Sequence, residues 1–305
     1  MSPKLLIVGG TGFIGHHIAK KAICNGFEVF SISKNSPAPD RLINGVKYFY
    51  IDLLDIKKLK DFFCNREIDF IVNTVGYIDH TLFKNGGDYI FENHFIASKN
   101  LINSINREYL KCFIHLGSSD EYGDNPSPQS EDQRESPISP YSFAKVSTCH
   151  LLQMLERTEK FPAIILRLFL VYGPSQNEKR LLPNLIKNCI KDNIIPVTLG
   201  EQIRDFCYVE DIVRAIFLIF KKRNIQGNII NIASGNPIQL KELIALVRNL
   251  IGKGEPLFGA LDYRKKESMS LYADISKAKR LLMWEPKYSL EDGLIETINW
   301  FKNNV

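Results

Sequence analysis

The glycine-rich stretch near the start of the chain restricts its possible folds more than any other feature. Four apolar residues, Leu5 to Val8, run directly into Gly9, Gly12 and Gly15. An uninterrupted apolar run of this kind is typical of a buried parallel strand, and the segment after Gly15 suits a helix. Glycines at this spacing allow a tight turn and a close approach of a pyrophosphate to the backbone, while the helix N-terminus offers free N–H groups. This arrangement predicts a dinucleotide site rather than an ordinary glycine-rich turn.

Strand and helix patterns alternate through the first half of the chain, which favours an α/β fold with a doubly wound parallel sheet and right-handed crossovers. Apolar runs predict strands at residues 28–33, 46–51, 69–74, 111–116 and 163–168, and helical spacing predicts helices at 57–64, 89–106 and 141–159. The second half predicts helices at 181–191, 211–222, 240–251 and 290–303 and a strand at 228–233.

These patterns predict two parts of unequal size. We expect residues 1–173 to form the dinucleotide-binding domain, with residues 204–234 returning to it. Residues 174–203 and 235–305 are expected to form a smaller C-terminal lobe that binds the substrate. Ligands of open α/β sheets bind at the carboxyl ends of the strands, so the lobe is expected to cover that edge.

Composition excludes several classes of function. The net charge of +5 is mild and fits an anionic small ligand, and no cluster of Lys and Arg coincides with a nucleic-acid motif. No apolar run is long enough to span a bilayer, and the segment before the first strand is too short for a signal peptide. The six cysteines form no C-x-x-C pair, so we expect buried thiols in a cytoplasmic protein, with no metal site and no disulfide framework.

The end of the second predicted strand bears on the choice of dinucleotide. An Asp or Glu there binds the ribose hydroxyls of NAD, whereas hydroxyl or cationic side chains accept the 2′-phosphate of NADP. This chain has Ser33 and Lys34 at that position and no acid. We therefore expect NADP(H) to be favoured and NAD(H) to remain possible, unless Lys34 is simply a solvated surface lysine.

A possible acid–base pair follows on the helix at residues 141–159. Tyr141 and Lys145 are four residues apart and so share a helix face, and Ser118 follows the predicted strand at 111–116. A cationic lysine favours the phenolate form of a nearby tyrosine, and bringing that phenol to neutrality takes about three pKa units, or roughly 4 kcal/mol. Ser118 can then hydrogen-bond a reacting oxygen. The pattern predicts hydride and proton transfer at a carbonyl or carbinol carbon.

Taken together, these segments resemble the extended short-chain dehydrogenase/reductases, in particular the NAD(P)-dependent nucleotide-sugar epimerases and dehydratases. The resemblance covers nearly the whole chain and rests on residues 9–15, 52–53, 118–123, 141–145, 167–174, 204–211 and 273–278. It implies a Rossmann-type dinucleotide domain. It also implies a homodimer formed by helices near residues 93–106 and 141–157, through the apolar residues Phe95, Ile96, Leu101, Ile102, Val146, Leu151, Leu152 and Met154.

The resemblance also implies roles for individual residues. Tyr141 would be the acid–base residue, Lys145 would hold the nicotinamide ribose and lower the Tyr141 pKa, and Ser118 would bind the reacting oxygen. The remaining cofactor contacts would come from the glycine turn with Phe13 and Ile14, from Ser33 and Lys34, and from Asp52 and Leu53 at the adenine. The substrate, a nucleotide-diphosphate sugar, would also meet Ser119, Asp120, Arg204 and Arg264. Arg204 could instead pair with Asp205 or Asp211, and Arg264 could be part of a solvated basic loop.

Two departures from the family pattern leave the reaction open. Dehydratases carry Thr-Asp-Glu where this chain has Ser118-Ser119-Asp120, so one acid is missing unless a deletion brings Ser119-Asp120-Glu121 into that place. Leu170 stands where the family often has Asn.

Three hypotheses follow from these residues. The first is an NADP(H)-dependent reductase acting at C4 of a 4-keto-6-deoxy nucleotide sugar. The second is a 4-epimerase with bound NAD, and dehydration is a less favoured variant. The third is a dinucleotide sensor without catalysis, which the presence of Ser118, Tyr141 and Lys145 disfavours because a sensor does not need them.

Overall fold

The computed structural model describes residues 2–263 and 267–304. The chain divides into two compact units, which are treated separately below. The first unit comprises the chain up to Asn125, Glu131–Leu168 and Val213–Ile230. The second unit comprises Pro126–Ser130, Phe169–Ile212 and the chain from Asn231 onward.

The first unit is built on a seven-stranded sheet in the order β11-β6-β5-β4-β1-β2-β3. Its strands are β1 (Lys4–Val8), β2 (Glu28–Ser33), β3 (Val46–Tyr50), β4 (Phe70–Asn73), β5 (Cys112–Ser118), β6 (Ala163–Leu168) and β11 (Ile229–Ile232). The neighbouring pairs from β6 to β3 are parallel, which confirms the predicted α/β fold. The strand order reverses between β1 and β4, and ligands of such sheets bind at the carboxyl ends of the strands beside this reversal.

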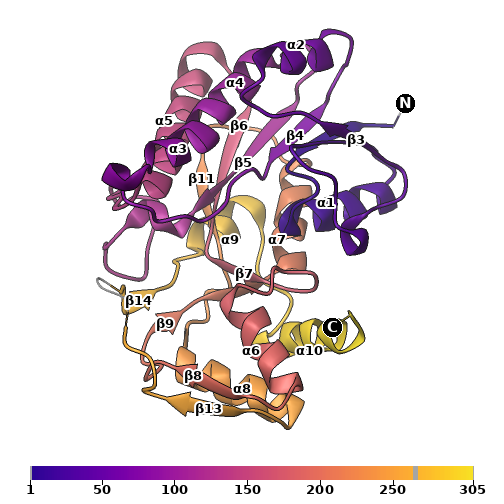
Figure 1. The fold of residues 1–305 in the computed structure, drawn as a ribbon. Helices are drawn as coiled ribbons and strands as arrows, with labels where there is room; N and C mark the ends of the chain where they lie inside the picture. The colour runs from indigo at the N-terminus through magenta and orange to yellow at the C-terminus, as the bar shows by residue number, and fades with distance from the viewer. Residues whose placement is uncertain (1, 264–266, 305) are drawn as a thin grey trace. The chain divides into compact units, whose positions relative to one another are not determined.

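Helices flank the sheet on both faces, as Figure 1 shows. They are α1 (Phe13–Cys24), α2 (Ile56–Cys64), α3 (Asp88–Phe91), α4 (Ala97–Ser104), α5 (Pro140–Glu159) and α7 (Val209–Ile219). A buried core that includes Leu6, Phe62, Leu101, Phe113 and Leu152 joins the sheet to α2, α4 and α5. The short apolar strand patterns correctly predicted the sheet because β1, β2, β5 and β6 bury nearly all of their side chains. The edge strand β3 is the exception, with its side chains half-buried or exposed.

One predicted helix is interrupted. The sequence predicts a single helix over residues 89–106, but the structure has α3, then a π-helical turn, η3 (Glu92–Ile96), and then α4. A π turn places one extra residue in a helical turn, and its hydrogen bonds run to the fifth rather than the fourth residue. Side-chain periodicity does not reveal such a turn. His94 lies in the middle of it and is buried.

The apolar residues assigned to a dimer contact are only partly available for one. Leu101, Ile102 and Leu152 belong to the buried core of the first unit, so they cannot meet a second copy. Met154 is exposed, as are Phe83, Tyr89 and Phe143 on the neighbouring segments. Phe95, Ile96, Val146 and Leu151 are half-buried. The predicted dimer contact therefore depends on these four residues and on the exposed ones.

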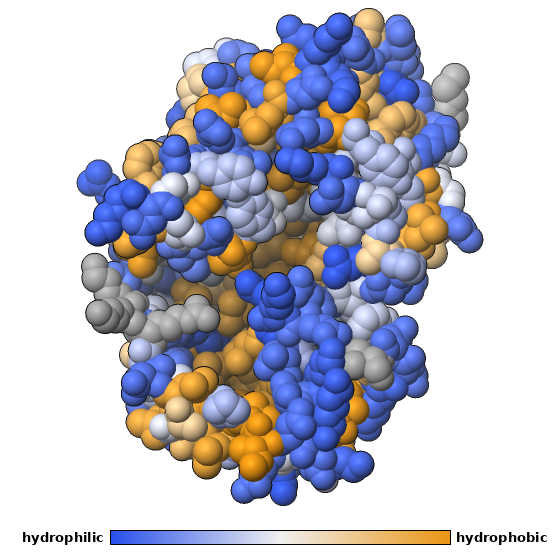
Figure 2. Space-filling model, in the orientation of Figure 1, coloured by the Kyte–Doolittle hydropathy of each residue, from blue (hydrophilic) through white to orange (hydrophobic). Residues whose placement is uncertain are grey.

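The second unit contains short strands and amphipathic helices. Its helices are α6 (Leu181–Ile190), α8 (Leu240–Ile251), α9 (Ser276–Leu282) and α10 (Leu290–Asn304). Its strands are β7 (Leu170–Tyr172), β8 (Ile194–Val197), β9 (Ile203–Arg204), β10 (Phe206–Tyr208), β12 (Ile238–Gln239), β13 (Glu255–Phe258) and β14 (Ser270–Leu271). These strands were not predicted from the sequence because two to four residues are too few to show a period. Hydrophobic residues gather on the surface over β8 and β13 (Figure 2), where Ile194, Leu257 and Phe258 are exposed.

The cysteines are all free thiols, but not all are buried. Cys112, Cys149, Cys189 and Cys207 are buried, whereas Cys24 and Cys64 are exposed. The prediction of six core thiols was therefore wrong for these two, which are the last residues of α1 and α2 and lie where each helix leaves the core. Among the described residues, no helix is both long and apolar enough to cross a membrane.

Candidate active site

The glycine turn between β1 and α1 is a backbone cradle. Gly9 has φ +90°, a conformation that side chains disfavour, and its carbonyl accepts the N–H of Gly12 at 2.9 Å. A Cβ on Gly15 would lie 2.2 Å from that same carbonyl oxygen. In the part of the chain that the structure describes, no side chain caps α1 at Gly12. The first N–H groups of the helix therefore face outward, and this cradle fits a pyrophosphate.

The end of β2 holds the turn from one side. A Cβ on Gly10 would lie 2.4 Å from Ser31 Oγ, so the turn lies directly against the strand. The N–H of Thr11 donates to Ser33 Oγ at 3.3 Å, and Ser33 is buried. The Ser33 hydroxyl, which is predicted to affect the choice between NADP and NAD, thus also stabilises the glycine turn.

Lys34 and Asp52, both predicted cofactor residues, contact each other. Lys34 Nζ lies 2.9 Å from Asp52 Oδ2, and the backbone N–H of Leu54 donates to Asp52 Oδ1 at 3.0 Å. The Leu54 hydrogen bond and then Lys34 lower the pKa of Asp52, and the hydrogen bond to Asp52 raises the pKa of Lys34. The Lys34 side chain is 64% exposed, so this pair lies at the surface. Leu53 is buried in the core beside this pair.

The end of β4 links the glycine turn to α5. Thr74 Oγ1 donates to Val8 O at 2.9 Å, which ties β4 to the strand that leads into the turn. Two residues later, a Cβ on Gly76 would lie 3.1 Å from Lys145 Nζ. A glycine at this position lets the lysine approach the backbone closely. The predicted cofactor cradle and the predicted catalytic helix are thus placed at the same edge of the sheet.

One face of α5 carries the predicted acid–base pair. Pro140 and a capping box between Ser139 and Ser142 fix the start of the helix, so Tyr141 lies in its first turn. Lys145 Nζ donates to Leu116 O at 2.8 Å and to Val75 O at 3.3 Å. Burial lowers the pKa of Lys145, while the charge of Glu121 raises it. Tyr141 and Lys145 are both buried.

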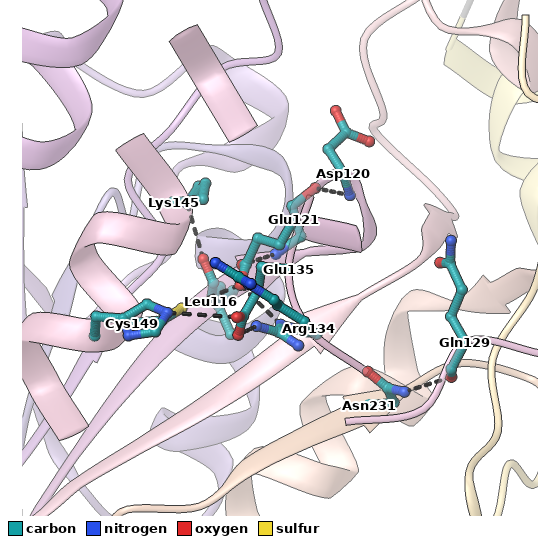
Figure 3. Close-up of polar contacts among 12 residues, drawn as sticks. Leu116, Asp120, Glu121, Gln129, Arg134, Glu135, Lys145, Cys149 and Asn231 are labelled. Carbon is teal, nitrogen blue, oxygen red and sulfur yellow. Dashed lines mark hydrogen bonds and ion pairs between the residues drawn. The ribbon is translucent and has the colours of Figure 1, made fainter. Parts of the chain in front are cut away.

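Ser118 is the last residue of β5. Its Oγ accepts the N–H of Asp120 at 3.2 Å, and its own N–H donates to Glu121 Oε1 at 2.8 Å. Ser119 is buried behind it. Figure 3 shows Asp120, Glu121 and Lys145 around the end of this strand, with Lys145 directed at Leu116. The structure therefore brings Ser118, Tyr141 and Lys145 to one place.

Two histidines that the sequence analysis did not single out lie beside Tyr141. The His94 ring stands edge-on to the Tyr141 ring, with centroids 5.1 Å apart, and the His80 ring centroid lies 6.2 Å away. Burial, and then the charge of Lys145, lower the pKa of His94 to about 3. His80 Nε2 lies 3.7 Å from Asp120 Oδ2. His94 lies in the π turn and His80 in a loop, and these two segments place the rings beside Tyr141. Neither kind of segment has a recognisable pattern in the sequence.

A buried ion pair was also missed. Arg167 Nε donates to Glu121 Oε2 at 2.7 Å, and both side chains are fully buried. Arg167 Nη2 donates to Glu135 Oε1 at 2.5 Å. In the sequence, Glu121 ends the triplet Ser119-Asp120-Glu121, and Arg167 begins the segment 167–174 that resembles the family. Neither position indicates that the two side chains form an ion pair.

In the second unit, Arg204 pairs with a residue that the sequence did not suggest. Its Nη2 lies 2.6 Å from Glu267 Oε1, and its Nη1 donates to the carbonyl of Ile203. The expected alternative pairing with Asp205 or Asp211 was wrong, because backbone and hydroxyl donors hold both of those carboxylates. Arg264 lies outside the described residues. Within residues 2–263 and 267–304, no three His, Cys, Asp or Glu side chains are grouped to hold a metal ion.

Comparison with known proteins agrees with this geometry. Residues 5–233 match the model of the NAD dependent epimerase/dehydratase family. A dTDP-glucose 4,6-dehydratase of Escherichia coli is 29% identical over 99% of this chain and 94% of its own length.

Solved structures of epimerases are also similar. A UDP-glucose 4-epimerase of Thermotoga maritima, crystallised with UDP-glucose, has a TM-score of 0.91 at 27% identity and covers 98% of this chain and 99% of its own. A UDP-glucuronic acid 4-epimerase of Bacillus cereus, in complex with UDP-glucuronic acid and NAD, has a TM-score of 0.86 at 28% identity. It covers 99% of this chain and 100% of its own. With its parallel sheet, glycine cradle and buried Tyr141 and Lys145, the chain belongs to the NAD dependent epimerase/dehydratase family and is an enzyme of the epimerase and oxidoreductase type.

Proposed function

We propose that this protein is a nucleotide-sugar 4-epimerase that uses tightly held NAD. The observation that carries the proposal is the α5 face at the end of β5, where Lys145 donates to Leu116 two residues before Ser118 and Tyr141 lies one turn earlier on the same helix. Relatives of this chain include nucleotide-sugar 4-epimerases crystallised with their sugars, which supports the substrate class.

The dinucleotide, when bound, supplies the chemistry of accepting a hydride from the sugar carbon and returning it. The side chains of this protein handle the proton. Tyr141 accepts the proton of the C4 hydroxyl when the carbonyl forms and gives it back when the carbonyl is reduced. Ser118 hydrogen-bonds the same oxygen and stabilises the charge that it gains or loses.

Lys145 has two roles in this proposal. Its cation favours the phenolate form of Tyr141, because an opposite charge nearby favours the ionised form of an acid. Its ammonium group also binds the nicotinamide ribose. The hydrogen bonds to Leu116 and Val75 leave one of its three N–H donors for that contact.

Arg204 is proposed to bind the diphosphate of the substrate, since its planar fork suits phosphate oxygens. The Glu267 carboxylate now occupies part of that fork at 2.6 Å. A diphosphate would therefore compete with Glu267, and Glu267 would weaken binding of the substrate. Asp120 is kept as a candidate contact to the sugar because it follows Ser118 and lies near His80.

A second candidate is an NADP(H)-dependent reductase of a 4-keto-6-deoxy nucleotide sugar. The observation that favours it is the end of β2, where Ser33 and Lys34 replace the acid that would bind the ribose of NAD. The Lys34–Asp52 pair is exposed, and such pairs contribute about 0–1 kcal/mol, so a 2′-phosphate could displace Asp52 from the lysine.

One preparation separates the two candidates. Denaturing the purified protein and identifying the released dinucleotide should yield close to one NAD per chain for the epimerase. Incubating the same preparation with 4-hydroxy nucleotide sugars should give the C4 epimer without added reductant. An empty protein that oxidises NADPH in step with reduction of a 4-keto nucleotide sugar would establish the reductase instead.

A further inference from the structure

A buried carboxylate lies directly behind Ser118. Glu121 belongs to the 3₁₀ turn η4 (Ser119–Tyr122) that follows β5, and its side chain has no exposed surface. Its Oε1 accepts the Ser118 N–H at 2.8 Å, and its Oε2 accepts Arg167 Nε at 2.7 Å. Burying a carboxylate is costly unless its oxygens are paired, and here both have partners.

The same carboxylate joins three elements of the first unit. Cys149 Sγ donates to Glu121 Oε2 at 3.3 Å, and Cys149 lies one helical turn after Lys145 on α5. Ser118 ends β5, and Arg167 lies in β6. Glu121, Lys145 and Cys149 face one another in Figure 3, with Leu116 of β5 between them. The strand that carries Ser118 and the helix that carries Tyr141 are thus linked through one side chain.

The charges around this link balance. Arg167 and Lys145 are the cations, and Glu121 and Glu135, which accepts Arg167 Nη2 at 2.5 Å, are the anions. Burial alone would lower the pKa of Arg167, but Glu121, Tyr122 and Cys149 together outweigh it and the pKa is raised. Glu121 also raises the pKa of Lys145 against the effect of burial. His150, exposed on α5, lies 3.4 Å from Glu135 Oε2 and away from Ser118.

We propose that Glu121 is a positioning residue, which fixes the Ser118 backbone against α5 and so directs the Ser118 hydroxyl at the oxygen that Tyr141 protonates. The inference rests on the proposed function, in which Ser118 binds that oxygen. The capping box of η4 explains the bond from the Ser118 N–H. It does not explain why the second oxygen of the same carboxylate is bound by β6 and α5.

Glu121→Gln tests the inference because a glutamine of the same shape has one carbonyl oxygen. That oxygen cannot serve both Arg167 and Ser118, and the charge-assisted bond to the guanidinium is the stronger of the two. The Ser118 N–H then faces an amide N–H, and the serine shifts. We expect kcat to fall about 10- to 100-fold, as small misplacements of reacting groups do, with KM and dinucleotide content within about twofold. Glu121→Asp keeps two oxygens and should restore part of kcat.

Glu135→Gln is the matched control. It removes one negative charge from the same guanidinium, since Glu135 binds Arg167 at 2.5 Å, but leaves the bond to Ser118 in place. We expect its kcat to stay within about twofold of the unaltered enzyme. Equal losses of kcat in Glu121→Gln and Glu135→Gln would overturn the inference, because the ion pair would then act only through stability.

A second variant and a second readout guard against misfolding. A Cβ on Gly117 would lie 2.5 Å from Glu121 Oε1, so Gly117→Ala displaces the carboxylate without changing any charge and should lower kcat in the same way. Hydrogen–deuterium exchange of the peptide that contains Ser118 should speed up in both variants and stay unchanged in Glu135→Gln. An unchanged exchange rate of the Ser118 peptide in Glu121→Gln and Gly117→Ala would overturn the inference, whatever the activity of these variants. If the unaltered enzyme turned over no nucleotide sugar, the proposed function would fail, and exchange alone would decide the role of Glu121.

Discussion

Lowering the pH from 7 to 5 should destabilise the first unit through three histidines, His16, His94 and His115, whose pKa values burial lowers. Burial and Lys145 hold the pKa of His94 at about 3, and burial and His17 hold the pKa of His16 at about 4. In the unfolded chain both have the ordinary value of 6.5. Below pH 6.5 the unfolded chain therefore binds more protons than the folded one, and stability is lost as the pH falls.

The expected magnitude follows from these values. At pH 5 the pH lies about 1.5 units below the pKa of an unfolded histidine, which is therefore protonated. The folded His94 and His16 are still mostly neutral at this pH. Each of them therefore removes about 2 kcal/mol from the free energy of unfolding. His94 and His16 together should remove about 4 kcal/mol between pH 7 and pH 5. His115, whose pKa burial also lowers, adds to this loss. That is a large part of the stability of an ordinary domain.

Urea unfolding at pH 7 and pH 5 measures the effect. His94→Phe replaces the ring that stands edge-on to Tyr141 with one that does not titrate. It should reduce the difference in the free energy of unfolding between the two pH values by about 2 kcal/mol. His80→Phe is the control, because that ring is half exposed; the difference should then stay as in the unaltered protein. An undiminished pH dependence in His94→Phe would refute the reasoning.

Three further predictions concern cofactor, substrate and assembly. Ser33→Asp should shift the preference toward NAD(H) over NADP(H) by at least tenfold, about 1.4 kcal/mol, in dinucleotide titrations; an unchanged ratio would show that β2 does not set the choice. Glu267→Gln should tighten nucleotide-sugar binding about two- to fivefold in calorimetry, since a neutral amide competes less for Arg204, whereas weaker binding would mean that Glu267 itself contacts the substrate. We predict a homodimer by light scattering at micromolar concentration, and Phe143→Glu, at an exposed ring stacked on Phe91, should yield monomers; a monomeric unaltered protein would contradict this.

The sequence predicted the parts of the site that depend on local spacing. Gly9, Gly12 and Gly15 lie within one turn, and Tyr141 and Lys145 lie within one helix, so periodicity and spacing are sufficient for both. The parallel sheet followed from short strands that are mostly apolar and buried. In each of these cases the information lies within about a dozen neighbouring residues.

The parts that the sequence did not predict depend on contacts between distant residues. Glu121 and Arg167 are 46 positions apart, and Arg204 and Glu267 are 63 apart. A charged residue within a buried strand requires a partner, but a single sequence does not say which acid supplies it. His94 reaches Tyr141 through a π turn, which leaves no signal in the spacing of apolar residues.

The central claim is that hydride leaves C4 of the sugar while Tyr141 takes the hydroxyl proton. The most direct test uses nucleotide-diphosphate hexoses deuterated at C4, with the unaltered enzyme, Tyr141→Phe and, as a control, Tyr89→Phe at an exposed ring. We predict epimerisation with the deuterium retained at C4, because the hydride returns to the carbon it left. Tyr141→Phe should lower kcat at least 10²-fold with dinucleotide binding intact, and Tyr89→Phe should not. Epimerisation that survives Tyr141→Phe, or loss of the deuterium to solvent, would contradict the account.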